Sequence, residues 1–194
     1  MTLFIAKLVW CVGVVGWYVI RLPHERRSRK TPVLSRRART REGVLLATSF
    51  AGLFILPAIY VTTGEPRSAD YSFHPALAWF GTLVFALALL LFYRTYRDLG
   101  RFWSVTLEIR QTHQLITTGV YRYVRHPTYA AFFLWAIAQA MLLPNWVAGL
   151  AGLACFGTLF GFRITREEQM MEAAFGDDYR AYAARTWRVI PGVF

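Results

Sequence analysis

The sequence is short of charge, of acidic residues and of cysteine. Only 17% of its 194 residues are charged and 56% are hydrophobic, whereas an ordinary soluble domain has about 25% charged residues. The high apolar content excludes an intrinsically disordered chain, because disorder requires low hydrophobicity. The two cysteines, Cys11 and Cys155, both lie in apolar runs, which excludes a disulfide framework.

Common motifs for nucleotide, phosphate and metal binding are also absent. The chain has no G-x-G-x-x-G, no P-loop and no Ser nucleophile elbow, so a nucleotide-like cofactor would need a site outside a Rossmann fold. His113 and His126 make no metal motif with the two cysteines, so we expect no metal site.

The charge that the chain does carry is strongly basic. It has 22 Lys and Arg against 11 Asp and Glu, a formal net charge of +11. Two classes of protein fit such a basic and apolar chain: a nucleic-acid binder with a large core, and a membrane protein with basic loops. The positions of the charges decide between them.

Long segments of the chain are almost uncharged. Residues 3–20 hold only Lys7, and no charge occurs in 43–63, 75–93 or 128–162. A helix needs about 20 apolar residues to cross the hydrocarbon core of a bilayer, so the first three segments each predict one span. The basic cluster follows the first segment instead of preceding it, which favours a retained helix over a signal peptide.

The fourth segment is too long for one span. Pro144 and Asn145 interrupt it near its middle, and such a pair favours a turn. We interpret the segment as a helical hairpin with helices at about 128–143 and 145–164. The sequence thus predicts an all-α integral membrane protein with about five transmembrane helices, the last two of which form the hairpin.

Lys and Arg concentrate in alternate loops. The loop after the first span is rich in Arg, the second loop holds Arg67 against Glu65 and Asp70, and segments 94–127 and 163–194 are again rich in Arg. By the positive-inside rule, the C-terminus is expected in the cytoplasm and the N-terminus outside. Anionic membrane lipids, and not nucleic acid, are then the expected partners of the basic loops.

Polar residues gather on both sides of the hairpin. Segments 94–127 and 163–194 flank it, so we expect them to meet at its cytoplasmic base. We divide the chain into an N-terminal three-helix membrane region, 1–93, and a C-terminal region, 94–194, with a cytoplasmic linker, the hairpin 128–164 and a cytoplasmic tail. A polar cluster that closes over a helical hairpin is a candidate small-molecule site.

The start of the fourth span is one candidate part of that site. His126 precedes Pro127, which begins the helix, and Tyr129 lies on the same face. The free N–H groups of a helix start favour anions. Alternatively, His126 is only a solvated cap.

The end of the fifth span is the second candidate. Arg163 and Glu167 are spaced i, i+4 and share one helix face, and Glu168 is adjacent. They form either a structural ion pair or a functional one, since ionisable residues at a membrane boundary that face a bundle are often functional.

Two further patterns favour structural interpretations. Gly157 and Gly161 form a G-x-x-x-G, which predicts close packing of this face on another helix. Most tryptophans lie near expected span ends, as in an aromatic belt, namely Trp10, Trp17, Trp79, Trp135, Trp146 and Trp187.

The polar segments resemble a known family. HQLITTGVYRYVRHPTY (113–129), the apolar hairpin, and then RITREE (163–168), FGDDY (175–179) and RTWRVIP (185–191) resemble the isoprenylcysteine carboxyl methyltransferase family. Its superfamily includes membrane phospholipid methyltransferases. The resemblance implies an S-adenosylmethionine-dependent methyltransferase, with five spans as in prokaryotic members and a cofactor pocket at the cytoplasmic membrane surface.

The resemblance also implies roles for individual residues. Arg163 matches the Arg associated with the methyl acceptor, and Glu167 the cofactor-contacting Glu. Cofactor binding is implied for His113, Gln114, Leu115, Ile116, Tyr121, His126, Pro127, Thr128, Tyr129, Glu167 and Glu168. The chain departs from eukaryotic members in lacking their extra N-terminal spans and a Gln near Thr106.

The implied reaction is methyl-ester formation on a lipophilic carboxylate such as an isoprenylcysteine, which would enter from the bilayer, with S-adenosylhomocysteine as the second product. Three alternatives remain at this point. They are a phospholipid or amine N-methyltransferase, an NADPH-dependent membrane reductase, and a small structural or transport protein.

Overall fold

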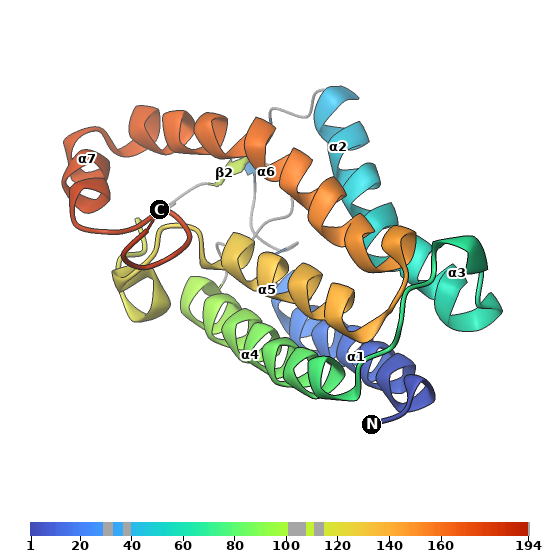
Figure 1. Ribbon diagram of the computed structural model, residues 1–194. Coiled ribbons are helices and arrows are strands. Elements are labelled where there is room, and N and C mark those ends of the chain that lie inside the picture. Colours follow the sequence, from blue (N-terminus) through green and yellow to red (C-terminus); the bar gives the residue numbers. More distant parts are fainter. Residues whose placement is uncertain (29–32, 37–39, 101–107, 111–114, 194) are drawn as a thin grey trace.

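The chain folds into a bundle of helices (Figure 1). The computed structural model describes residues 1–28, 33–36, 40–100, 108–110 and 115–193. Its elements in chain order are α1 (Leu3–Ser28), β1 (Val33–Arg36), α2 (Thr40–Phe50), the π-helix η1 (Ala51–Ile55), α3 (Leu56–Thr63), η2 (Arg67–Ala69), α4 (Pro75–Leu99), β2 (Glu108–Arg110), η4 (Gly119–Arg122), α5 (Pro127–Leu142), α6 (Trp146–Phe175) and α7 (Asp177–Ala184).

Among the residues that the structure describes, four helical segments are long and apolar enough to cross a membrane: α1, the continuous α2–η1–α3, α4 and α6. The fifth apolar helix, α5, has 16 residues, so its crossing of the membrane remains a prediction. The expected all-α membrane fold is confirmed, with one addition. β1 and β2 form a short antiparallel ladder that the apolar pattern did not predict.

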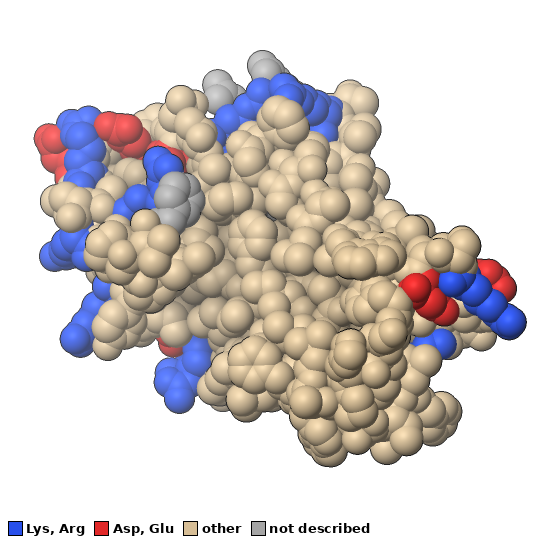
Figure 2. Space-filling model, in the orientation of Figure 1, with Lys and Arg blue, Asp and Glu red and all other residues tan. Residues whose placement is uncertain are grey.

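The helices bring distant parts of the chain to the same end of the bundle. α4 packs on α1 and α5, and α6 packs on α5 and α2. The end of α4, the start of α5 and the end of α6 lie on one side of Figure 1, and α3 and the α5–α6 turn lie on the other. In Figure 2, charged side chains gather at the margins and leave a broad uncharged surface between them.

An aromatic cluster joins four segments in the core. Trp17 of α1 meets Trp135 of α5 edge to face, with ring centroids 5.8 Å apart. The ring centroids of Phe54 in η1 and Trp135 are 5.2 Å apart, and those of Phe92 in α4 and Phe132 in α5 are 4.7 Å apart. Such tilted and edge-to-face pairs stabilise a core beyond the area that they bury.

This cluster corrects the aromatic-belt interpretation. Trp10, Trp17 and Trp135 are 4%, 6% and 0% exposed, so they are core residues. Trp79 and Trp146 are more than half exposed and fit the belt. Hydropathy alone does not distinguish the two groups, because both lie in apolar helices.

The π-helix frees a carbonyl that α5 then binds. The N–H of Leu56 reaches back five residues to the carbonyl of Ala51. In the same five-residue pattern, the Gly52 carbonyl would accept from residue 57. That residue is Pro57, which has no N–H to donate. Gln139 of α5, fully buried, instead donates to the Gly52 carbonyl at 3.1 Å and to the Ala148 carbonyl of α6 at 2.7 Å. One amide thus ties together three segments of the core.

Close helix approach occurs at other glycines than the predicted pair. A Cβ on Gly52 would lie 2.5 Å from the Ala151 carbonyl, and one on Gly149 would lie 2.6 Å from the Leu143 carbonyl. Around Gly157 and Gly161, a Cβ would meet nothing within 4 Å among the described residues. Within the described part of this chain, no helix packs closely on this G-x-x-x-G, and its contact with a helix of a second chain stays a prediction.

Asn145 secures the end of the bundle where α5 and α6 meet. Its Oδ1 accepts from the N–H groups of Val147 and Ala148 at 3.0 and 2.9 Å, which caps α6. Its Nδ2 donates to the Pro66 carbonyl and to Asp70 Oδ1, both at 2.8 Å. Because Asn145 is fully buried, these four bonds have little competition from water.

α6 runs on to Phe175, beyond the predicted end at 164.

We expect Asn145→Ala to lower the free energy of unfolding by about 2 kcal/mol, because the buried start of α6 loses its acceptor. Thermal denaturation in detergent micelles measures the change. Thr158→Ala is the control: its exposed hydroxyl bonds only to the Ala154 carbonyl of its own helix, so we expect a change of about 0.5 kcal/mol or less. Equal losses in the two variants would contradict the role of Asn145.

Candidate functional site

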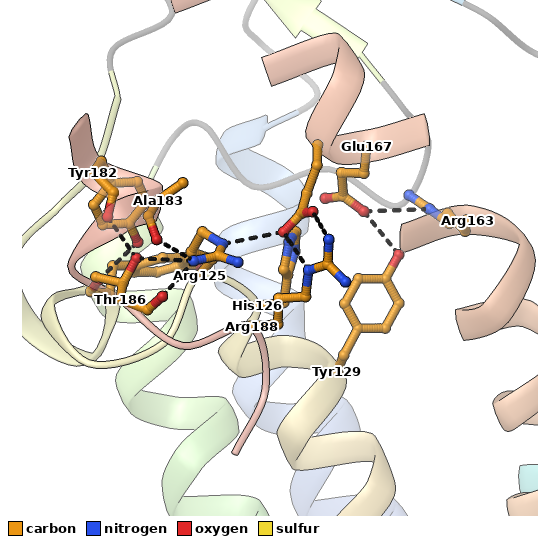
Figure 3. A network of polar contacts seen from close by, with 11 residues as sticks. Arg125, His126, Tyr129, Arg163, Glu167, Tyr182, Ala183, Thr186 and Arg188 are labelled. Carbon is orange, nitrogen blue, oxygen red and sulfur yellow. Dashed lines mark hydrogen bonds and ion pairs between the residues drawn. The ribbon is translucent and has the colours of Figure 1, made fainter. Parts of the chain in front are cut away.

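The segment after α7, residues 185–193, lies beside the start of α5, and we call it the tail from here on. Arg125 N–H donates to the Trp187 carbonyl at 2.7 Å, and His126 N–H donates to the Arg188 carbonyl at 2.9 Å. Val124 and Trp187 form a parallel bridge. We call the side chains gathered here the polar base, which comprises Arg125, His126, Tyr129, Arg163, Glu167, Glu168 and Arg188. Figure 3 labels all of them except Glu168.

Glu168 is the centre of one half of the polar base. Its carboxylate lies 3.1 Å from Arg125 Nε, 2.9 Å from Arg188 Nη2 and 3.4 Å from His126 Nε2. The Glu168 and Arg125 side chains are only 15% and 11% exposed, so the attraction is weakly screened by solvent. Glu168 therefore joins α6 to both the start of α5 and the tail.

Arg125 extends this half toward α7. Its guanidinium also donates to the carbonyls of Ala183, at 2.7 Å, and Thr186. Tyr182 donates from its hydroxyl to the Tyr121 carbonyl at 2.7 Å. Burial raises the pKa of Tyr182 to about 12, so its phenol keeps the proton that this bond needs. The tail is thus held by charged and neutral donors together.

Glu167 belongs to the other half, on a different face of α6. Tyr129 donates from its hydroxyl to Glu167 Oε2 at 2.8 Å. Arg163 Nε lies 3.7 Å from the same oxygen, and Arg163 Nη1 lies 3.8 Å from Oε1 of Glu42. These distances exceed that of a direct charge-assisted hydrogen bond. Glu167 is 27% exposed, so a ligand can reach it.

The predicted site residues are partly brought together. Tyr129, Arg163 and Glu167 are in contact, as are His126 and Glu168. Pro127 is buried at the start of α5, beside half-buried Thr128, and Tyr121 is buried in η4. Leu115 and Ile116 are half-buried ahead of η4. His113 and Gln114 lie outside the described residues.

Sequence reasoning missed several members of the network: Arg125, Arg188, Thr186 and Glu42. The first two were interpreted only as topology-setting charges, although RTWRVIP contains Arg188. Glu42 has a weak signal, as the one acid in the first turn of α2. Its distance from Arg163 in the sequence concealed their contact.

The hydroxyl of Tyr179, in the same region, is a buried polar group. Tyr179 of α7 is 5% exposed, and its hydroxyl has no hydrogen-bond partner among the residues that the structure describes. Burial raises its pKa, and so does the charge of Glu168. A buried phenol of this kind suits a polar group of a bound molecule.

We expect Glu168→Gln to loosen the tail, because the neutral amide loses the charge that binds Arg125 and Arg188. Hydrogen exchange of the Arg125 and His126 amides should quicken by about tenfold or more. Asp178→Asn, at an exposed acid of α7, is the control and should leave both amides unchanged. Unaltered exchange in Glu168→Gln would contradict the role given to this carboxylate.

Comparisons with known proteins agree on one family. Residues 79–173 match the family model of the isoprenylcysteine carboxyl methyltransferase (ICMT) family. The chain is 43% identical over 79 residues to a protein-S-isoprenylcysteine O-methyltransferase of Schizosaccharomyces pombe, covering 41% of this chain and 34% of that protein. It is 33% identical over 84 residues to the Homo sapiens protein of the same name, covering 43% and 30%.

The chain spans about a third of the length of the two relatives named above. A solved structure of the eukaryotic intramembrane Ras methyltransferase ICMT is similar, with a TM-score of 0.53 at 24% identity, and the alignment covers 82% of this chain and 55% of that one. This likeness supports the fold. Residues 79–173, which hold α5, most of α6 and all of the polar base but Arg188, are thus the part of this chain that is similar to the isoprenylcysteine carboxyl methyltransferase family.

Proposed function

We propose that this protein transfers a methyl group from S-adenosylmethionine to the carboxylate of a lipophilic acceptor, most simply an isoprenylcysteine. The observation that carries the proposal is the contact of Tyr129, Glu167 and Arg163 at one end of an apolar helix bundle. It places an anion and a cation side by side where α5 and α6 reach the bundle end. The name of the relatives, protein-S-isoprenylcysteine O-methyltransferase, supports the same acceptor class.

The residues of the polar base fit S-adenosylmethionine, which has a carboxylate, an ammonium and a sulfonium. Glu167, whose carboxylate accepts from the Tyr129 hydroxyl, is half-buried and would pair with the ammonium. His126 and the start of α5 suit the carboxylate or the ribose hydroxyls. The buried Tyr179 hydroxyl offers one further polar contact. When bound, S-adenosylmethionine supplies an electrophilic methyl group.

Arg163 suits the acceptor. A carboxylic acid with a pKa of about 4 is already ionised near neutral pH, so the protein needs no general base. Arg163 would bind the acceptor carboxylate by a charge-assisted pair. Glu42 and Glu167 lie on two sides of Arg163 and hold its guanidinium in place. The chain's task is then to align the reacting groups and to exclude water.

Aromatic side chains give the acceptor's apolar part a place beside the polar base. The Tyr129 ring lies 5.3 Å from Phe160 and 5.8 Å from Phe156, and Phe133 lies 5.2 Å from each of these rings. These rings belong to α5 and α6, and one of them, Tyr129, bonds to Glu167. A prenyl chain arriving from the bilayer would meet them before its carboxylate reached Arg163.

We further propose that the polar base faces the cytoplasm. The segments that reach it are rich in Arg, whereas the loop at the opposite end has Arg67 against Glu65 and Asp70. The positive-inside rule therefore supports a cytoplasmic C-terminus and an outside N-terminus.

We expect Glu167→Ala to weaken S-adenosylmethionine binding by about thirtyfold or more, because the ammonium loses a charged partner. Isothermal titration of the detergent-solubilised protein measures the dissociation constant. Glu172→Ala is the matched control, since this acid lies farther along α6 and pairs with Arg180. An unchanged constant in Glu167→Ala would refute the assignment of the cofactor site.

We expect Arg163→Ala to lower kcat/KM by about a hundredfold and to alter cofactor affinity by about threefold at most, because Arg163 acts on the acceptor. The assay follows methyl-ester formation on a prenylated cysteine in lipid vesicles. Phosphatidylethanolamine, in a parallel assay, tests the amine alternative. Ester formation by the parent supports the proposal; methylation of the amine alone, or of neither acceptor, refutes it.

A further inference from the structure

The tail presents an apolar and basic surface on its outer side. Thr186 and Val189 are buried, whereas Trp187 and Ile190, which follow them, are 47% and 53% exposed. Val193, farther along, is 75% exposed. Several exposed apolar side chains in one ordered segment are typical of a surface that binds a partner.

The segment before α5 adds to the same surface. Trp187 N–H donates to the Tyr123 carbonyl at 3.1 Å, which sets these two residues side by side, and Tyr123 is 57% exposed. Arg122 lies over the Tyr123 ring at 5.3 Å. We call the group the tail patch, which comprises Arg122, Tyr123, Arg185, Trp187, Arg188, Ile190 and Val193.

The charge of the tail patch has one sign. Residues 119–125 and 185–193 contain four arginines and no acid. Asp98, an acid that contacts η4, already accepts from the Val120 N–H at 2.9 Å, and its side chain is 11% exposed. The exposed arginines, Arg122 and Arg185, are therefore available to an anionic partner.

The depth of the tail patch is set by α5. A 16-residue helix is about 24 Å long, shorter than a hydrocarbon core of about 30 Å. The residues just ahead of α5 must then lie at the membrane boundary if α5 spans. The pairing of Arg125 with Trp187 and of His126 with Arg188 holds the tail at that same level.

We propose that the tail patch docks on the anionic headgroup layer of the surrounding bilayer. Exposed Trp and Tyr prefer this layer, because one end of each ring is apolar and the other is polar. Each Arg near an anionic lipid surface adds to the attraction. The lipid surface thereby helps to hold the tail, and with it Arg188, against α6. This inference depends on membrane embedding and not on the proposed reaction.

The test uses the full chain in nanodiscs, one chain per disc, and lipids brominated near the headgroup. The fluorescence difference between the parent and Trp187→Phe isolates Trp187. We expect lipid bromine to quench this signal in phosphatidylcholine containing phosphatidylglycerol, and less in phosphatidylcholine alone. Ile190→Asp should abolish the quenching. Ala181→Asp, which adds the same charge at an exposed position of α7, should retain it.

A second variant tests the charge alone. In Arg122→Gln with Arg185→Gln, the difference between the two lipid compositions should disappear. No quenching of Trp187 in either lipid would overturn the proposal, and so would equal quenching in both for the parent chain. If Trp187 were protected from quenching by lipid bromine only in discs that hold two chains, Trp187 would lie in a contact between copies. That result would also overturn the proposal. Because Ile190 is exposed, unchanged thermal denaturation verifies that Ile190→Asp folds.

Discussion

The exclusion of charge from the apolar helices is the constraint on which the rest of this structure depends. Unsolvated charge is costly inside a bilayer, so the ionisable side chains gather where the helices end. There the charged side chains pair with one another, since a half-buried ion without a partner would destabilise the fold. The polar base is the outcome: Glu167 and Glu168 each take basic or hydroxyl partners from other segments.

The adjacent residues Glu167 and Glu168 have different partners, because a helix turns about 100° per residue and places them on different faces of α6. Glu168 faces the start of α5 and the tail and is enclosed by Arg125, His126 and Arg188. Glu167 faces Tyr129 and Arg163 and keeps a more exposed edge. The enclosed acid, Glu168, connects the segments of the polar base. In the proposed function, the half-buried Glu167 would bind the cofactor, so that the two adjacent acids would combine a structural and a binding role.

Much of this could be predicted from the sequence, because apolar runs and turn signals act locally. The helices lie near the predicted segments, and Pro144 and Asn145 separate α5 from α6. Contacts between distant segments were harder. Neither the π-helix with its Gln139 bond nor the β1–β2 ladder leaves a local signal. The G-x-x-x-G has no helix neighbour within the described part of this chain, because small residues permit close approach without supplying a neighbour.

By itself, the sequence determined that the chain is an apolar helical membrane protein with its acids concentrated near Arg163, since hydropathy and charge are properties of each segment alone. Only the tertiary structure decided which cation meets which acid. Glu42 approaches Arg163 from a helix more than a hundred residues earlier, and Arg188 reaches Glu168 through the path of the tail. Such pairings depend on how helices pack, and packing is a property of the whole fold.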